Sequence, residues 1–565
     1  MGALLALHDR LPAAGLAAVL LALGAPLHGG TAMPVDGSIQ VFANGVVITN
    51  DPGRPRAGML VIDGARVAWC GEPAELPAAW RDIPRRDLEG AVIVPGLADA
   101  HLHVEGVGRA LDELDLVGTE SLEAIVAMVA DAVEDAPAGA WIQGRGWDQN
   151  DWAPPGMPRH DALSRQSPRN PVCLRRIDGH AALVNAAALQ AAGLTATTAD
   201  PPGGKILRDA GGEPTGVLID AAVNLVTRHI PDPTPETRRR WIAGGLSACA
   251  AAGLTMVHDA GVDTGALAAY RALLAEERLP IRVNVMLDGG DEELLREMLP
   301  AGPAVPPEER LIIRTVKLYA DGALGSRGAA LLAPYADEPS TTGLFLTAPD
   351  ALEAAMQRID DAGFQCAVHA IGDRANRVVL DIIEELQRAA PHRDRRHRIE
   401  HAQIVAPGDI RRFAELGVVA SMQFTHATSD MPWADERLGP ERLTGAYVWK
   451  ALLETGAVLA QGSDAPVESV NPWWGLYAGM TRQDAAGQPA GGWFPEQRLS
   501  AEEALAAATR GAARAAFLET KLGALKPGYW ADFIICDTDP LQAEPSRVRN
   551  TQVHETWVGG EKVYP

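Results

Sequence analysis

Cysteine is scarce in this sequence. Among 565 residues there are only five, which stand singly at Cys70, Cys173, Cys249, Cys366 and Cys536. The odd total and the missing CxxC spacing argue against a disulfide framework and against a thiolate zinc site. We therefore expect isolated, reduced cysteines inside the core.

Positive charge is also in short supply. Acidic residues outnumber Lys and Arg by 73 to 50, which leaves a formal net charge of −23. A chain with this charge is poorly suited to bind a polyanion, so we expect no nucleic-acid partner. The shares of hydrophobic residues (47%) and charged residues (22%) are those of a globular protein, so a large buried core is available.

Long apolar runs are missing apart from one near the N-terminus. Residues 11–27, LPAAGLAAVLLALGAPL, precede a stretch of small residues, an arrangement typical of a secretory signal peptide over residues 1–32. Translation from Met33 is the alternative, because MPVDGSIQVFANGVVITND already resembles the start of a cytosolic enzyme. The protein is periplasmic or secreted in the first case and cytoplasmic in the second. In neither case do we expect a stable membrane span in the mature protein.

The two ends of the chain are rich in short β-strands, whereas the middle alternates strands with helices. Residues 33–94 and 521–565 carry apolar runs separated by Gly, Asn-Gly and Asp-Gly turns, which predicts one small β-sandwich domain formed from both chain ends. Residues 95–480 predict a parallel sheet covered by helices, and residues 481–520 a connecting helical segment. The predicted fold class is α/β, a TIM-type (β/α)8 barrel with this composite sandwich.

Eight candidate barrel strands can be counted, the number that a TIM barrel requires. They begin near residues 92, 172, 255, 314, 365, 398, 418 and 458. Nearly every one ends in a polar or ionisable residue, and barrel active sites are built where the strands end. Residues 145–172 and 200–240, which are rich in Pro, Gly, Asp and Arg, are expected to be long loops that enclose the substrate.

A pair of histidines closes the first candidate strand in DAHLHVEG. His101 and His103 are two residues apart, so both side chains lie on one face of the strand and can bind a single metal ion. Four more ionisable residues each end a different strand: Lys317, His369, His401 and Asp464. Closure of the barrel would bring all six together.

Five motifs in order carry a family resemblance. VPGLADAHLH, VKLYADGALGSRGAALLAPY, AVHAIGDRAN, RIEHAQ and GSDAPVESVNPWWGLYAG together resemble the amidohydrolase superfamily, in particular its YtcJ-like branch, which includes N-substituted formamide deformylase. The resemblance runs from about residue 38 to the end of the chain. It implies a metal-dependent (β/α)8 hydrolase.

The resemblance also implies a role for each of these residues. His101 and His103 would bind the more buried metal ion and His369 and His401 the more exposed one, while Asp464 would contact the first ion and a hydroxide. The cofactors implied are divalent metal ions, with zinc expected and two ions per chain.

Lys317 matches the lysine that similar proteins carboxylate with carbon dioxide, so that the carbamate bridges both ions. A free ammonium has no lone pair and cannot be a ligand, whereas a carbamate offers two oxygens and a negative charge. The alternative is an unmodified barrel lysine in a salt bridge with the nearby Asp321.

The implied activity is hydrolysis of a non-peptide C–N bond by a metal-activated hydroxide. Asp464 would be the catalytic residue, accepting the proton of the attacking water and passing it to the departing amine. The expected substrate is a small-molecule amide, such as an N-substituted formamide or a small hydrophobic acyl amine. Cyclic amides, N-acyl amino acids, carbamates and esters are alternative substrates, and a non-catalytic binding protein on the same fold is a further alternative. The oligomeric state stays open, a homo-oligomer included.

Other residues near the motifs are weaker candidates for the site. Five are predicted to face the substrate: His180, Trp147, Arg327, His426 and Trp474.

Three further residues are predicted to support the site. Asp373 and Arg374 are candidates to orient the imidazole of His369, with helix capping by Asp373 as the alternative. His258 is expected to pack at the top of the barrel or to support a ligand.

Overall fold

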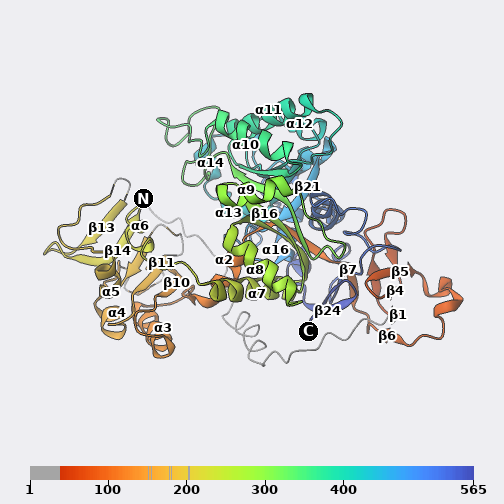
Figure 1. The fold of residues 1–565 in the computed structure, drawn as a ribbon, viewed down its shortest axis with the longest axis horizontal. Helices are drawn as coiled ribbons and strands as arrows, with labels where there is room; N and C mark the ends of the chain where they lie inside the picture. The colour runs from red at the N-terminus through yellow and green to blue at the C-terminus, as the bar shows by residue number, and fades with distance from the viewer. Residues whose placement is uncertain (1–38, 150–151, 154–155, 177–178, 180, 202–203) are drawn as a thin grey trace. The chain divides into compact units, whose positions relative to one another are not determined.

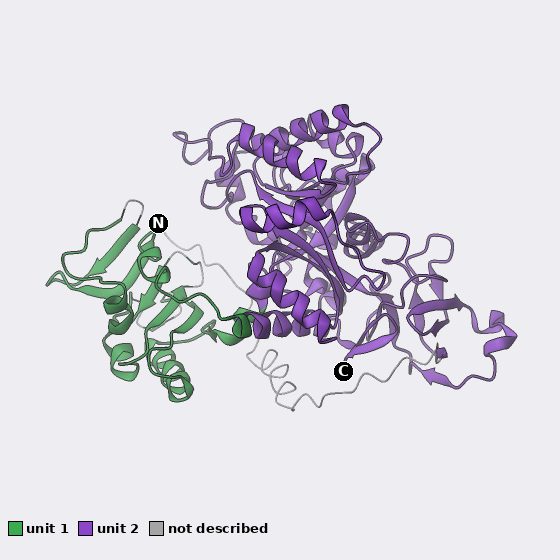
Figure 2. Cartoon of the chain, viewed as in Figure 1, with its two compact units in different colours: residues 1–24, 108–237 green, residues 25–107, 238–565 purple. Residues whose placement is uncertain are grey.

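The computed structural model describes residues 39–149, 152–153, 156–176, 179, 181–201 and 204–565. These residues divide into two compact units (Figure 2): residues 108–237 belong to unit 1, and residues 39–107 and 238–565 belong to unit 2. The predicted signal peptide and His180 lie outside the described residues.

Unit 2 is built on an eight-stranded parallel sheet that forms the barrel (Figure 1). The strands follow one another in the order β21 (Val458–Gly462), β20 (Val419–Gln423), β19 (Arg398–His401), β18 (Gln365–Ala370), β17 (Leu311–Tyr319), β16 (Arg282–Asp288), β15 (Leu254–Val262) and β8 (Leu97–Leu102).

The two edge strands of this sheet meet at their carboxyl ends. The backbone N–H of Asp464 donates to the carbonyl of His101 at 2.7 Å, and the N–H of His103 donates to the carbonyl of Ala465 at 2.8 Å. Gly462 permits this approach, because a Cβ atom there would lie 2.6 Å from the backbone nitrogen of His101. The predicted TIM-type barrel is confirmed.

Helices alternate with the barrel strands along the chain and pack against them in one large apolar core. Their bounds are α2 (Val104–Asp112), α7 (Pro235–Ala251), α8 (Thr264–Ala275), α9 (Glu292–Ala301), α10 (Pro349–Asp361), α11 (Asp373–Ala389), α12 (Ile410–Glu415), α13 (Phe424–Asp430), α14 (Ala434–Leu438), α15 (Trp449–Glu454) and α16 (Pro472–Thr481). Aspartates start two of them: Asp263 and Asp291 accept hydrogen bonds from the first turns of α8 and α9. After α16, the chain forms α17 (Ala501–Ala506), a π-helix (Ala507–Gly511) and α18 (Ala512–Ala515).

Both chain ends meet in one β-rich part of unit 2, as predicted. A six-stranded sheet has the order β24 (Glu561–Tyr564), β23 (Val553–Val558), β22 (Phe533–Cys536), β7 (Val92–Pro95), β2 (Val46–Ile48) and β3 (Arg56–Ala57). A four-stranded sheet has the order β5 (Arg66–Gly71), β4 (Met59–Asp63), β1 (Ile39–Ala43) and β6 (Arg85–Asp87). The rings of Phe42, Phe533 and Trp557 pack together, with centroids 5.3 to 5.5 Å apart, and join the early and late strands. The short α19 (Pro545–Arg549) also belongs to this end of the chain.

Unit 1 has a sheet of its own. Its order is β13 (Gly204–Arg208), β14 (Pro214–Asp220), β12 (Ala181–Val184), β11 (Val172–Arg176), β10 (Ile142–Trp147) and β9 (Leu114–Asp115), accompanied by α3 (Leu122–Asp135), α4 (Asp161–Gln166), α5 (Ala186–Ala191) and α6 (Asn224–Thr227). Asn185 holds several of these parts together: it caps α5 and donates to the carbonyls of Ser167 and Asn170.

One predicted barrel strand was assigned to the wrong sheet. The strand that begins at residue 172 is β11 of unit 1, and its place in the barrel count is taken by β16, which the sequence analysis did not select. Both segments are short apolar runs, and periodicity cannot show which sheet a strand joins. Residues 200–240, predicted as a loop, contain β13, β14, α6 and the start of α7.

All five cysteines are free and buried, as expected. Among the residues that the structure describes, no helix combines the length and the apolar character needed to cross a membrane.

Candidate metal centre

His101 and His103 lie at the carboxyl end of β8, and each ring is held by an acceptor at its Nδ1 atom. His101 Nδ1 lies 2.5 Å from Oε2 of Glu400, and His103 Nδ1 lies 2.9 Å from the carbonyl oxygen of Ala260. Because these oxygens accept, Nδ1 carries a proton in both rings, and Nε2 of each ring is directed into the cluster. The two Nε2 atoms face Oδ1 of Asp464, at 3.6 and 3.2 Å.

His369 and His401 come from the neighbouring strands β18 and β19. The ring centroid of His401 lies 4.5 Å from that of His369 and 4.8 Å from that of His101. His401 Nδ1 lies 2.8 Å from Oε1 of Gln423, and His369 Nε2 is buried without a hydrogen-bond partner among the described residues. The four histidines predicted as ligands therefore converge at the carboxyl end of the barrel.

Asp464 follows β21 and has a backbone φ of +60°. Residues with a Cβ atom seldom adopt this left-handed conformation, and those that do are concentrated at functional sites. Burial by itself would raise the pKa of Asp464, but the surrounding imidazoles, led by His103, hold that pKa well below its usual range. The carboxylate is therefore ionised in the middle of the histidines.

Lys317 on β17 is almost fully buried beside the histidines, with 1% of its surface exposed. Its Nζ atom lies 3.4 Å from Nε2 of His101 and 5.1 Å from the ring centroid of Tyr319. Burial lowers the pKa of Lys317 to about 8. A minor fraction of the amine is therefore neutral at pH 7, more than an exposed lysine would have.

Asp321, the alternative partner considered for Lys317, is engaged elsewhere. Its carboxylate accepts hydrogen bonds from the backbone N–H groups of Ala330, Ile371 and Gly372, at 2.8 to 2.9 Å. Its Oδ1 atom also lies 3.7 Å from Nε2 of His369. Asp321 thus fixes the loop after β17 against the end of β18.

The donor atoms of this cluster fit a divalent metal ion. Those of His101, His103 and Asp464 lie within 4.8 Å of one another, and the same holds for His401, His426 and Asp464. Imidazole nitrogens and carboxylate oxygens are the donors that zinc and related divalent ions prefer. Burial lowers the pKa of His101 to about 4 and that of His369 to about 3, so these rings are neutral at pH 7, as ligation requires.

Arg398 and Glu400 on β19 support the cluster, and neither was predicted from the sequence. Arg398 is fully buried and donates to Glu400 at 2.7 and 3.0 Å and to Nδ1 of His258 at 2.7 Å. Glu400 in turn orients His101. A signal for them existed: in RIEH, two charged residues stand in a strand that was expected to belong to the buried barrel, where charged residues are rare unless paired.

Of the two roles predicted for His258, its contacts favour support of a ligand over packing at the top of the barrel. Since an arginine can only donate, Nδ1 of His258 accepts from Arg398. The imidazole is fully buried, and burial holds its pKa well below the usual range. His258 therefore acts on the cluster through Arg398 and Glu400.

Asp373 and Arg374 do not orient His369, contrary to one of the two predictions for them. Oδ1 of Asp373 accepts from the N–H of Leu332 at 2.8 Å, and Arg374 lies over the ring of Phe345. The capping position of α11 is occupied by Gly372, so the capping alternative for Asp373 is wrong as well. The sequence placed both side chains near His369, but the turn into the helix directs them to the loop after β17.

Three of the residues predicted to face the substrate have other partners in the structure. Trp147 is fully buried in the core of unit 1, where its indole N–H donates to the carbonyl of Leu174 at 2.8 Å. Arg327 forms two hydrogen bonds to Asp337, at 2.8 and 3.2 Å. Trp474 lies in the first turn of α16, and the guanidinium carbon of Arg549 lies over its ring, 5.1 Å from the ring centroid.

His426, by contrast, lies in the cluster itself. It belongs to α13, directly after β20, and its ring is stacked against that of His401 at a centroid distance of 6.1 Å. Its Nε2 atom lies 3.9 Å from Oδ2 of Asp464. The structure therefore brings together seven side chains: those of His101, His103, Lys317, His369, His401, His426 and Asp464.

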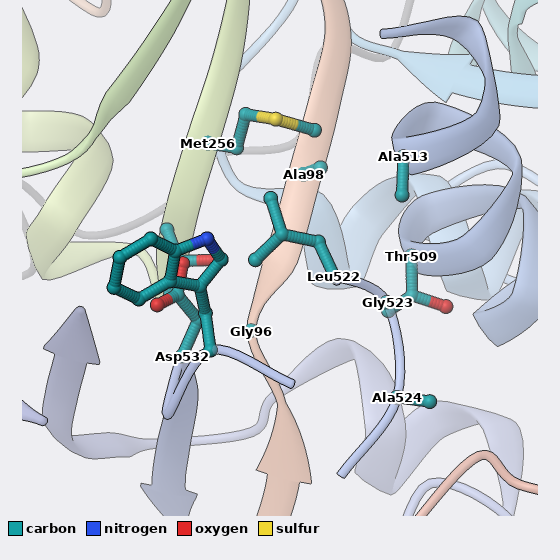
Figure 3. Close-up of a pocket in the computed structure, with 11 residues that line it drawn as sticks. Gly96, Ala98, Met256, Thr509, Ala513, Leu522, Gly523, Ala524 and Asp532 are labelled. Atoms are coloured by element: carbon teal, nitrogen blue, oxygen red, sulfur yellow. The ribbon is translucent and has the colours of Figure 1, made fainter. Parts of the chain in front are cut away.

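A small cavity lies at the opposite, amino-terminal end of the barrel (Figure 3). Ala98 on β8, Thr255 and Met256 on β15, and Leu522 and Trp530 from the C-terminal part of the chain are among its lining residues. Its volume of about 10 Å³ is room for one water molecule. Because barrel enzymes use the carboxyl ends of their strands, this cavity is structural.

Comparison with known proteins agrees with this arrangement. A family model described as "Amidohydrolase family" matches residues 86–564. This chain belongs to the amidohydrolase family. The amidohydrolase is 34% identical to the protein YtcJ of Bacillus subtilis (strain 168), over 84% of this chain and 90% of the relative. It is 28% identical to the N-substituted formamide deformylase of Arthrobacter pascens, over 92% and 97% of the two chains. The predicted YtcJ-like branch is thereby confirmed.

A solved structure supports the same fold. The crystal structure of an uncharacterized metal-dependent hydrolase from Pyrococcus horikoshii OT3 superimposes with a TM-score of 0.76 at 28% identity, over 90% of this amidohydrolase and 99% of that chain. The protein is a metal-dependent amidohydrolase, an enzyme that hydrolyses C–N bonds, and divalent metal ions are the cofactors of its superfamily.

Proposed function

We propose that this amidohydrolase holds two zinc ions per chain and hydrolyses the amide bond of a small hydrophobic acyl amine. The observation that carries the proposal is the direction of the imidazoles. His101, His103 and His401 have an acceptor at Nδ1, which leaves Nε2 of each ring free to bind a metal next to the ionised Asp464. In this proposal His101 and His103 bind one ion, and His369 and His401 the other.

Lys317 is proposed to be carboxylated and to bridge the two sites. Its neutral amine attacks the carbon of CO2, a new N–C bond forms, and one proton is released as the carbamate becomes an anion. The pKa of about 8 that burial gives Lys317 favours this reaction, because only the neutral amine has a lone pair. Its Nζ atom lies 3.4 Å from Nε2 of His101, so the two oxygens of a carbamate would lie close to the imidazoles.

The side chains supply the proton transfers of hydrolysis. A divalent ion held by these residues would lower the pKa of a bound water from 15.7 to about 7 and would polarise a carbonyl oxygen. Asp464 is ionised and accepts the proton that the attacking water loses. It then returns the proton to the nitrogen of the departing amine as the C–N bond breaks. Glu400, held by Arg398, keeps His101 in the tautomer that can bind a metal.

The substrate class is proposed from the relative and from the surface near the site. The Arthrobacter pascens relative is named for N-substituted formamides. Tyr319, whose ring lies 5.9 Å from that of His369, and Val467, three residues after Asp464, expose 36% and 63% of their surface. Such exposed apolar side chains favour a hydrophobic group on the substrate.

A metal and substrate assay tests this function. The purified full-length protein should contain close to two divalent ions per chain by mass spectrometry. Chelation should abolish hydrolysis of a panel of formamides, N-acyl amino acids, cyclic amides, carbamates and esters, and zinc should restore it, with the highest kcat/KM for hydrophobic formamides. Full activity in the metal-free protein would overturn the proposal, and a preference for another member of the panel would identify the alternative substrate.

A further inference from the structure

His426 differs from the other histidines of the cluster in its partner at Nδ1. The Nδ1 atoms of His101, His103 and His401 face oxygen acceptors. His426 Nδ1 instead lies 3.2 Å from Nε2 of Gln403, which is an amide nitrogen and can only donate. Nδ1 of His426 therefore accepts, which places the ring proton on Nε2.

The orientation of the Gln403 amide is itself fixed by a second acceptor. Gln403 Nε2 also lies 3.4 Å from Oδ2 of Asp430, and that same carboxylate oxygen accepts the hydroxyl hydrogen of Tyr447. An amide turned the other way would place its oxygen against this carboxylate. Asp430 and His426 lie four residues apart on α13, so both face the same side of the helix, toward Gln403.

The Nε2 atom of His426 points to the reaction site without a partner. It is buried, makes no hydrogen bond among the described residues and lies 3.9 Å from Oδ2 of Asp464, beyond hydrogen-bond distance. The His426 side chain is only 10% exposed, so an unused N–H group here is costly unless a ligand accepts its hydrogen.

We propose that His426 is a catalytic residue that donates a hydrogen bond from Nε2–H to the carbonyl oxygen of the substrate, and that it is not a further metal ligand. Gln403, Asp430 and Tyr447 are positioning residues that keep the proton on Nε2. The identity of the substrate in this inference rests on the proposed amide hydrolysis. The tautomer of His426 does not depend on that proposal, because it follows from the contacts of the ring. The hydrogen bond strengthens as negative charge develops on the oxygen, so it lowers the barrier more than it improves substrate binding.

Replacement of His426 separates a donor from a metal ligand. In His426→Leu, we expect kcat to fall by roughly 10²-fold, the usual effect of removing one such donor, with little change in KM. His426→Gln keeps an amide N–H group on a side chain of similar length and should retain more of kcat. Both variants should keep the metal content of the wild type. Loss of an ion from both variants, or a wild-type kcat in His426→Leu, would overturn the proposal.

Two glutamines offer a matched pair of variants. Gln403→Leu removes the donor to His426 and should lower kcat while metal affinity stays unchanged. Gln423→Leu removes the acceptor at His401 and should weaken metal binding by about 10- to 100-fold, as loss of such a supporting contact typically does. Equal effects of the two variants on metal affinity would contradict the opposite roles assigned to them.

A spectroscopic measurement tests the tautomer without any substrate. With 15N-labelled histidine in the full-length protein, the signals that disappear in His426→Gln should show a protonated Nε2 and an unprotonated Nδ1. In Gln403→Leu, the same ring should become a mixture of tautomers. An unprotonated Nε2 in the wild type would overturn the proposal even if amide hydrolysis is confirmed. Absence of amide hydrolysis together with a protonated Nε2 would instead refute the proposed substrate class and uphold the donor role.

Discussion

The two ends of the barrel both bury ionisable side chains, but these side chains differ in their hydrogen-bond partners. At the amino-terminal end, Arg282 forms two hydrogen bonds to Asp532, at 2.7 and 3.0 Å, and stacks on Trp530. At the carboxyl end, Nε2 of His369 and Nε2 of His426 are buried without a hydrogen-bond partner among the described residues. The Arg282–Asp532 pair is complete in itself and stabilises the fold, whereas these two imidazoles keep Nε2 atoms available for ligands.

This difference shows why burial alone does not identify a site. Arg282 and Lys317 are equally buried, each with 1% of its surface exposed. The guanidinium of Arg282 has a carboxylate partner in direct contact, whereas the Nζ atom of Lys317 lies beside an imidazole and has a lowered pKa. The absence of a carboxylate in direct contact, together with a lowered pKa, distinguishes Lys317 from Arg282.

The largest effect is expected when the proposed carbamate of Lys317, which would bridge the two metal sites, is removed. Lys317→Ala should remove one of the two ions and lower kcat by on the order of 10⁴-fold, because the barrier loses the several kcal/mol that metal chemistry supplies. Short carboxylates in solution should restore part of the activity by filling the vacated volume. Metal content is measured by mass spectrometry, and an unchanged content would refute the bridging role.

Loss of the proton acceptor should have a somewhat smaller effect. Asp464→Asn keeps the size of the side chain but cannot accept the proton, so we expect kcat to fall by about 10²- to 10⁴-fold while some metal remains bound. Steady-state kinetics beside metal analysis checks this. An Asp464→Asn enzyme with wild-type turnover would exclude the aspartate from the proton transfer.

At the amino-terminal end, the expected effect is on stability. Arg282→Met leaves Asp532 buried and unpaired, which should lower the free energy of unfolding by about 3–5 kcal/mol. The remaining folded protein should keep its metal content and kcat. Arg388→Met is the matched control, because Arg388 pairs with Glu384 and Glu385 on an exposed face of α11 and should contribute only about 0–1 kcal/mol. Similar losses of stability in both variants, measured by urea unfolding, would argue against a structural role for the buried pair.

The smallest effect is expected at Glu400, which orients a proposed metal ligand through a hydrogen bond. Glu400→Gln weakens the hydrogen bond that orients His101 and should reduce the metal affinity of the folded protein by about 10- to 100-fold. Competition with a chromogenic chelator measures the affinity. An unchanged affinity would show that Arg398 and Glu400 only fill the inside of the barrel.

The site was more predictable from sequence than the assignment of every strand. His101 and His103 share a face because side chains alternate along a strand, and His369, His401, Lys317 and Asp464 converge because parallel strands end at one edge of the barrel. The strand from residue 172 was placed in the wrong sheet because its local pattern matches that of the barrel strands.

Hydrogen-bond partners were the least predictable feature. Glu400 and Arg398 stand in the same short motif as His401, yet their contacts with His101 and His258 join residues far apart in the sequence. His426 was predicted only to face the substrate, and nothing in its local sequence shows that Gln403 would donate to it.

The sequence by itself determined the class of the fold, the family and the residue types gathered at the strand ends, because these depend on local periodicity and on motifs. Only the tertiary structure decided which ring nitrogen of each histidine carries the proton. That choice depends on whether the neighbour at Nδ1 accepts, as Glu400 does for His101, or donates, as Gln403 does for His426. Such neighbours come from distant segments, so the chemistry of otherwise identical side chains is fixed only when the barrel closes.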